Sequence, residues 1–84
     1  MTDENSDKNK AYILVSVELG KTNEVLAKLK QIPNVTSVAV ITGEYDIIVR
    51  VETDTMDEIY NRTQEIHLIE GILETTTSII QKEF

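Results

Sequence analysis

The stretch that decides the fold is residues 42–52, Thr-Gly-Glu-Tyr-Asp-Ile-Ile-Val-Arg-Val-Glu. A Gly-x-Tyr-Asp turn joins two apolar runs, 38–41 and 47–51, which is the pattern of a β-hairpin. Gly43 allows a positive φ and a close approach to its backbone. Asp46 places a carboxylate beside the turn, where it can cap backbone N–H groups or face a ligand. If the protein binds a small molecule, we expect the site here.

Outward from the hairpin, the spacing of apolar residues predicts the order β-α-β-β-α-β. We expect strands over residues 11–19, 35–42, 46–52 and 72–80. The first helix is predicted to run from Thr22 or Asn23, as N-cap, to about Ile32, where Pro33 stops it. The second is predicted to follow Thr55, which forms a capping box with Glu58, and to end near His67.

Apolar and acidic residues also recur at a step of 34 along the chain, for example Val17-Glu18 and Val51-Glu52, or Glu24-Val25 and Glu58-Ile59. Two βαβ halves would produce this repeat. Right-handed crossovers in both halves place the helices on the same face of the sheet. We therefore predict an α+β, ferredoxin-like βαββαβ fold, with a four-stranded antiparallel sheet in spatial order 4-1-3-2 and two helices on one face.

The second face of this sheet is also predicted to be apolar. Leu14, Ala39, Ile41 and Ile48 alternate with the residues that would face the helices. Two short helices cover only one face, so the other would be an exposed apolar patch on a monomer. Self-association through that face, giving a dimer or a larger homo-oligomer, is the simplest resolution.

Composition limits the partners and the location. Eight Lys and Arg against 15 Asp and Glu give a net charge of -7, so we expect no direct contact with nucleic acid. There is no cysteine, and no apolar run approaches the roughly 20 residues that span a bilayer. Residues 1–10 are polar and lack a signal-peptide core, so we expect a disordered tail, a folded domain over 11–84, and a cytoplasmic protein without membrane contact.

Several short motifs together resemble a known family, the effector-binding (RAM) domain of the Lrp/AsnC transcriptional regulators. The residues that carry the resemblance are Glu24-Val25, Ile32-Pro33-Asn34-Val35, Thr42-Gly43-Glu44-Tyr45-Asp46, Arg50-Val51, Gly71-Ile72 and Thr75-x-Thr77. The hairpin motif followed by the last-strand motif is a specific combination, and the match covers residues 11–80.

The resemblance implies the same ferredoxin-like fold, dimers formed through the sheets, and further assembly, often to octamers. It also implies an amino-acid effector bound near the hairpin turn, between neighbouring dimers. Matched position by position, the ligand-binding candidates are Gly43, Tyr45, Asp46, Thr75 and Thr77. Family members carry an N-terminal helix-turn-helix domain, for which the ten residues before the first strand are too few. We therefore expect a stand-alone effector domain that acts through a full-length regulator of the family.

Each candidate also has a purely structural interpretation. Asp46 can bind an ammonium group or cap its own hairpin. Thr75 and Thr77 share one face of a strand, where threonine is in any case a good strand former. No catalytic set, metal-ligand spacing or cofactor motif is evident, so we expect a non-catalytic ligand sensor. The alternatives are a structural assembly subunit without a ligand, and an accessory subunit of an enzyme, since ACT domains share this topology.

Overall fold

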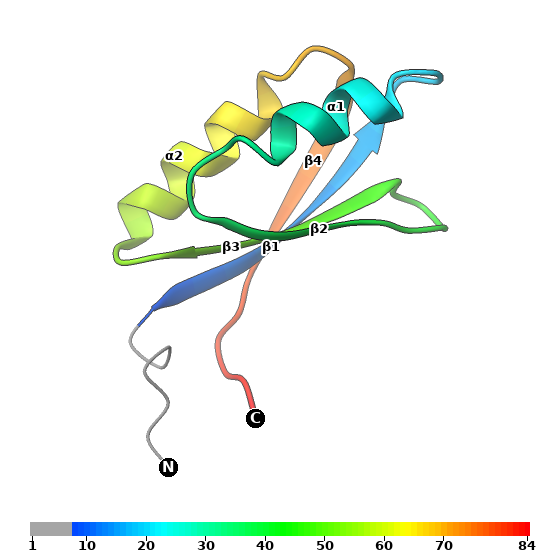
Figure 1. Cartoon of the computed structure of the whole chain (residues 1–84). Helices are drawn as coiled ribbons and strands as arrows, with labels where there is room; N and C mark the ends of the chain where they lie inside the picture. Colours follow the sequence, from blue (N-terminus) through cyan, green and yellow to red (C-terminus); the bar gives the residue numbers. More distant parts are fainter. Residues whose placement is uncertain (1–7) are drawn as a thin grey trace.

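The computed structural model describes residues 8–84 and has the predicted order of elements (Figure 1). The elements are β1 (Asn9–Val17), α1 (Thr22–Leu29), β2 (Val35–Val40), β3 (Ile47–Thr53), α2 (Met56–His67) and β4 (Ile72–Ile79). Both helices lie on one side of the sheet, as Figure 1 shows. Within the described residues, no helix is long and apolar enough to cross a membrane.

The four strands form one antiparallel sheet in the order β2-β3-β1-β4, which is the order predicted. Its register fixes which side chains share a face: Ile13 of β1 stands opposite Val49 of β3 and Thr77 of β4. Because side chains alternate along a strand, this register assigns the positions of the three strands to a face, up to the irregularity at Ser16 and Val17 where the β1–β4 pairing shifts. The ferredoxin-like fold is therefore confirmed.

The core lies between the sheet and the helices. It consists of alternate residues of β1 and β3 with two residues of each helix: Ala11, Ile13, Val15, Val17, Val25, Leu29, Ile47, Val49, Val51, Ile59 and Ile66. Positions related by the step of 34 occupy equivalent places, since Val25 and Ile59 are both buried on the inner faces of their helices. The repeat seen in the sequence is thus a repeat of the core.

The first helix is shorter than predicted. It begins at Thr22, with Lys21 as N-cap and no side-chain hydrogen bond to the cap, so the prediction of Thr22 or Asn23 as cap was wrong. It ends at Leu29, and a tighter turn follows in which the Ile32 N–H donates to the Leu29 carbonyl over 3.2 Å. Pro33 disfavours helical backbone at Ile32, which still packs against the core.

Strand β1 begins earlier than predicted. The boundary between a tail at 1–10 and a domain starting at 11 was set too late, because Asn9 and Lys10 already pair with Thr53 and Glu52 of β3. Lys10 is only 8% exposed. A polar residue can extend a strand in this way when its backbone joins the ladder and its charge finds a partner. The rest of the predicted tail, residues 1–7, lies outside the described residues.

The face of the sheet away from the helices, here called the open face, has two unlike halves. Near the hairpin it carries Leu14 and Ile48, which pair across β1 and β3, with Ala39 beside them on β2. Towards the start of β1 the same face carries Lys10, Arg50 and Glu52. The apolar half was predicted from the alternation of residues along the strands, whereas the charged half was not predicted.

Candidate functional site

The hairpin turn projects from the end of the sheet between β2 and β3 (Figure 1). Gly43 has a φ of 127°, a conformation that strongly favours glycine, and it lies in the open with no heavy atom near the position of a Cβ. The Ile41 N–H donates to the Asp46 carbonyl over 2.9 Å and closes the turn. The turn is therefore held at its base and accessible at Gly43.

The Asp46 side chain has a structural partner on the neighbouring strand. Its Oδ2 accepts a hydrogen bond from the backbone N–H of Val17 at 2.8 Å, while its own N–H donates to the Val15 carbonyl at 2.9 Å. The β1–β4 pairing shifts register between Ser16 and Val17, which leaves the Val17 N–H in need of an acceptor. Within residues 8–84, the second oxygen, Oδ1, accepts no recorded bond.

The Tyr45 side chain reaches across the open face. Its hydroxyl lies 2.8 Å from Oγ1 of Thr76 on β4, although β1 separates β3 from β4 in the sheet. Thr76 stands opposite Leu14, so both belong to the open face. Thr76 was not among the predicted site residues, because the Thr-x-Thr pattern points to its two neighbours and no local signal in the sequence distinguishes it.

Thr75 and Thr77 lie on the opposite face, towards the helices. They stand opposite the buried Val15 and Ile13, and Thr75 Oγ1 is 3.2 Å from Nδ1 of His67 at the end of α2. Thr77 lines an apolar groove of about 300 Å³ between α2 and β4, together with Met56, Ile59, Tyr60, Thr63 and Ile79. The five candidate residues thus form two groups, with Tyr45 and the two threonines on different faces of the sheet.

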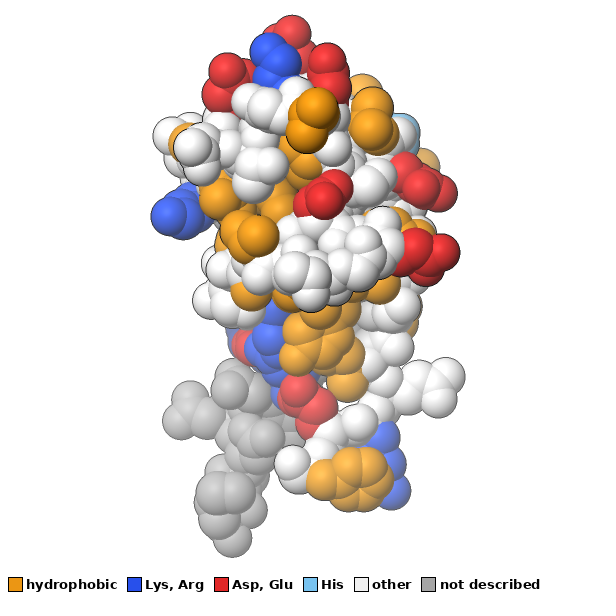
Figure 2. Space-filling model, turned by 90° about the vertical axis from the view of Figure 1, so that its right-hand side faces the viewer, with side chains coloured by type: hydrophobic (Ala, Val, Ile, Leu, Met, Phe, Trp, Pro, Cys, Tyr) orange, Lys and Arg blue, Asp and Glu red, His pale blue; other side chains and the backbone are white. Residues whose placement is uncertain are grey.

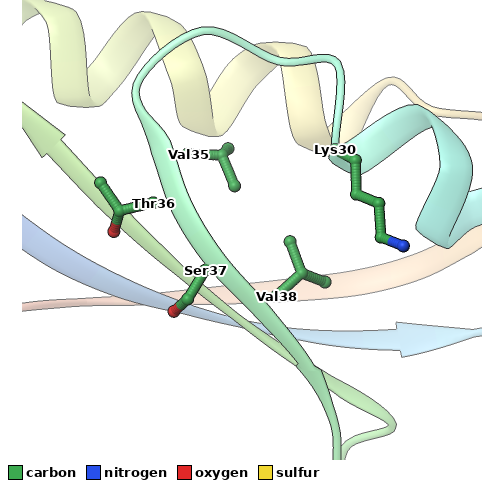
Figure 3. Close-up of a pocket in the computed structure, with 5 residues that line it drawn as sticks. All are labelled: Lys30, Val35, Thr36, Ser37 and Val38. Carbon is green, nitrogen blue, oxygen red and sulfur yellow. The ribbon is translucent and has the colours of Figure 1, made fainter.

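A smaller hollow of about 160 Å³ lies between the end of α1 and β2 (Figure 3). Its walls are Lys30, Val35, Thr36, Ser37 and Val38, and Figure 3 shows Lys30 and Val38 directed into the space between helix and strand. Thr36 occupies a bulge in the β2–β3 pairing, where its hydroxyl donates to the Arg50 carbonyl at 3.2 Å. Neither hollow includes a residue of the hairpin turn.

The charged half of the open face is a compact network. Glu83, in the segment after β4, accepts from Lys10 Nζ at 3.0 Å and from Arg50 Nη2 at 2.8 Å, and Arg50 also pairs with Glu52. The guanidinium lies 6.0 Å from the centre of the Tyr12 ring. Hydrogen bonds from Arg50 and Lys10 hold the pKa of the Glu83 carboxyl below its ordinary value, and the bond to Glu83 raises the pKa of Arg50.

The chemistry available at the turn is that of recognition. A carboxylate oxygen at Asp46 can accept from an ammonium, and exposed amides and hydroxyls of the turn can donate to an anion. Among the described residues, no cluster of His, Cys, Asp and Glu that could hold a metal ion is present. None of the five candidate residues is basic, so any bound carboxylate would have to be held by amide or hydroxyl donors.

Comparison with known proteins places this chain in a family. Residues 10–84 match the Lrp/AsnC ligand binding domain, so the chain belongs to that family and the resemblance seen in the sequence is confirmed. The HTH-type transcriptional regulator FL11 of Pyrococcus furiosus is 38% identical over 72 residues, covering 86% of this chain and 48% of that regulator. The chain therefore spans about half the length of the curated relatives it matches.

Two solved structures of similar length are also close. FFRP-DM1 is 40% identical with a TM-score of 0.80, and the match covers 86% of this chain and 97% of that one. PHS023 from Pyrococcus horikoshii is 39% identical with a TM-score of 0.79, covering 89% and 92%. A complex of the regulator NMB0573 from Neisseria meningitidis with L-Met, 24% identical over 89% of this chain and 51% of that one, shares the fold at a TM-score of 0.78.

One match is to an enzyme. Homocitrate synthase of Sulfurisphaera tokodaii is 36% identical over 62 residues, which is 74% of this chain but only 14% of the enzyme. The domain is therefore similar to a small part of that enzyme, while FL11 and NMB0573 are named as transcriptional regulators.

Proposed function

We propose that this chain is a non-catalytic sensor that binds an amino acid, or a similar small zwitterion, at the hairpin turn. The observation that carries the proposal is the state of Asp46. Its Oδ2 is anchored by the Val17 N–H, and its Oδ1 accepts no bond recorded within the described residues. A carboxylate that is held in place by a backbone N–H of the neighbouring strand is a preorganised acceptor for an ammonium group.

Gly43 and Tyr45 complete the proposed site. Gly43 leaves its backbone open to close approach, because no side chain stands beside it. Tyr45 places its hydroxyl 2.8 Å from Thr76 Oγ1 on the open face, and it belongs to the same turn as Asp46. Thr75 and Thr77 face the helices, so they belong to the proposal only as secondary candidates. The bound L-Met of the Neisseria regulator supports an amino acid as the ligand class.

Assembly is the second part of the proposal. Leu14, Ile48 and Ala39 form an apolar area on the open face, with no helix over it (Figure 1). A second copy packed on this face would bury that area in a two-fold, self-complementary contact. The ligand site at the edge of such a dimer would then be completed by neighbouring subunits, and the homo-oligomer could extend to an octamer.

We infer that the response reaches DNA through a partner, a full-length Lrp/AsnC-type regulator. The net charge of -7 opposes direct contact of this chain with nucleic acid. Relatives named as regulators, such as FL11, support this role over an assembly subunit without a ligand. An accessory role in an enzyme has weaker support, because the homocitrate synthase match covers 14% of that protein.

The test is calorimetric titration of the wild type and of Asp46→Asn with a panel of amino acids. Asparagine keeps an oxygen for the Val17 N–H and removes the charge that would pair with the ammonium. We expect the best ligand of the wild type to bind the variant about 1.5–3 kcal/mol more weakly, the range for a hydrogen bond to a charged group.

Glu44→Gln is the matched control, since it removes one acidic charge from the exposed part of the same turn. It should leave affinity nearly unchanged. Thermal unfolding of each variant shows whether the hairpin survives. Equal affinities of wild type and Asp46→Asn would refute the assignment of Asp46, and no binding across the panel would favour the assembly subunit.

A further inference from the structure

A groove of about 300 Å³ lies on the flank of the molecule, between α2 and the strand β4. Its walls are Met56, Ile59, Tyr60 and Thr63 from the helix and Thr77 and Ile79 from the strand. One end is bounded by the contact of His67 with Thr75, whose Nδ1 and Oγ1 lie 3.2 Å apart. Towards the other end, Met56, Tyr60 and Ile79 are 48%, 64% and 43% exposed. Three large apolar side chains of the groove are therefore left in water in the single chain.

The strand beside the groove is an edge strand. In the described part of the sheet, β4 stands last in the order and pairs only with β1, to which the Ile80 N–H donates at the Lys10 carbonyl. Backbone groups along an antiparallel strand point alternately to its two sides, so those of Thr75, Thr77 and Ile79 point away from β1. The side chains of the same three residues face the helices, because they stand opposite buried residues of β1. The groove and the free backbone groups therefore lie side by side.

This arrangement is suited to the addition of a further strand. When an extended peptide pairs with a free sheet edge, main-chain hydrogen bonds supply affinity and alternate side chains enter the neighbouring groove. Exposed edges are usually protected from such pairing by lysine, proline or a bulge. Residues 75–79, Thr-Thr-Thr-Ser-Ile, contain neither a charge nor a proline, and the irregularity of the β1–β4 pairing lies outside them. This stretch of β4 therefore has no feature that opposes pairing.

We propose that the outer edge of β4 binds an extended segment of another protein, with large apolar side chains at alternate positions and basic residues at its flanks. The basic flanks follow from charge: the chain carries -7, Asp57 is exposed next to Met56, and Figure 2 shows acidic side chains spread over the upper part of the molecule among few basic ones. A second copy fits less well, because it carries the same charge and the central residues of its β4 that would face the groove are Thr75 and Thr77. The proposal goes beyond the ligand site at the hairpin turn and does not rest on it.

Fluorescence anisotropy tests the edge with labelled peptides of the form Lys-Thr-X-Thr-X-Thr-Lys, where both X are Val, Leu or Phe. We expect methylation of the backbone nitrogens of the X residues to weaken binding at least about tenfold, because it removes the donors that would face β4. Glutamate in place of the two lysines should also weaken binding, and less so in about 1 M salt. Tyr60→Ala should raise the dissociation constant at least about tenfold, as for a buried interface aromatic. Leu68→Ala is the matched control, since Leu68 is an exposed apolar residue that does not line the groove.

Amide hydrogen exchange, measured by nuclear magnetic resonance, locates the added strand. With peptide bound, we expect slower exchange at Thr75, Thr77 and Ile79, whose N–H groups point outwards, and little change at Thr76 and Ser78, whose backbone groups point to β1. No binding by any of the three peptides, or equal binding of the methylated ones, would overturn the proposal. Slow exchange at the three outward amides without peptide, lost on dilution of the protein, would assign this edge to a second copy and overturn it as well.

Discussion

At the scale of the residue, Gly71 combines a backbone constraint with a packing constraint. Its φ is 101°, and an added Cβ would lie 3.1 Å from both Lys21 Cβ and Val25 Cγ2. Gly20 has a φ of 85° but nothing within 4 Å of such a Cβ. We expect Gly20→Ala to cost about 1–3 kcal/mol from backbone strain alone. Gly71→Ala should cost about 1–3 kcal/mol more, from crowding at α1.

Denaturant unfolding of the two glycine variants measures this difference in the free energy of unfolding. Equal losses of unfolding free energy in the two variants would mean that α1 moves aside at no cost, so that the close contacts at Gly71 do not matter. A smaller loss for Gly71→Ala than for Gly20→Ala would contradict the expected crowding even more strongly.

Residue types at the site were predictable from the sequence, but their partners were not. Turn chemistry identified Gly43 and Asp46 because glycine and aspartate have local preferences. The bond from Val17 to Asp46 and the contact of Tyr45 with Thr76 join residues 29 and 31 positions apart, through a neighbouring strand. Such contacts depend on strand order and register, which the sequence expresses only through the whole alternation pattern.

At the scale of the element, the two helices begin differently. Thr55 accepts a hydrogen bond from the Glu58 N–H at 3.2 Å, and Glu58 Oε1 accepts from the Thr55 N–H at 3.2 Å, so the predicted capping box is confirmed. Helix α1 has no side-chain cap at all. We expect Thr55→Ala to cost about 1 kcal/mol of unfolding free energy, and Thr22→Ala, at the first turn of α1, to cost much less.

Circular dichroism during thermal unfolding compares the two threonine variants. If Thr22→Ala lowered the unfolding free energy as much as Thr55→Ala, the Thr22 hydroxyl would have to cap α1 after all. If Thr55→Ala left the unfolding free energy unchanged, the interaction of Asp57 with the helix dipole would be enough to stabilise the start of α2 without the capping box.

Element order was predictable because the apolar period changes clearly between strand and helix. Element ends were less so: α1 ends at Leu29 because the turn before Pro33 tightens, although Ile32 keeps the apolar spacing. The charged half of the open face was also missed. Arg50 and Glu52 alternate with buried valines, and only the approach of Glu83 from the far end of the chain makes them a network.

At the scale of the whole molecule, the two faces of the sheet differ in their residues and in what covers them. The inner face is filled by the helices, and its residues on β1 and β3 are almost wholly buried. The open face is half apolar and half charged, and the charged half is neutral only with the C-terminal segment in place. A domain of 84 residues gains little stability from its own core, so burial of the apolar half by a second copy would add substantially to it.

Ile48→Asp tests that assembly. Ile48 lies on the open face, opposite Leu14 of β1 and Ala39 of β2, and is partly exposed in the single chain. An aspartate there would be hydrated in the monomer, so the fold should persist. In the dimer it would be an unpaired buried charge, at a cost of roughly 3 kcal/mol or more, which raises the dissociation constant at least about a hundredfold.

Leu19→Asp is the control for Ile48→Asp, because it makes the same kind of change at a residue 99% exposed and outside the sheet. Analytical ultracentrifugation at micromolar concentration should give an oligomer for the wild type and for Leu19→Asp, and a folded monomer for Ile48→Asp. If the Ile48→Asp protein sedimented like the wild type, the interface between copies would have to lie on another face. In that case the apolar half of the open face would be covered by something other than a second sheet, and the position of the ligand site between neighbouring subunits would have to be sought elsewhere.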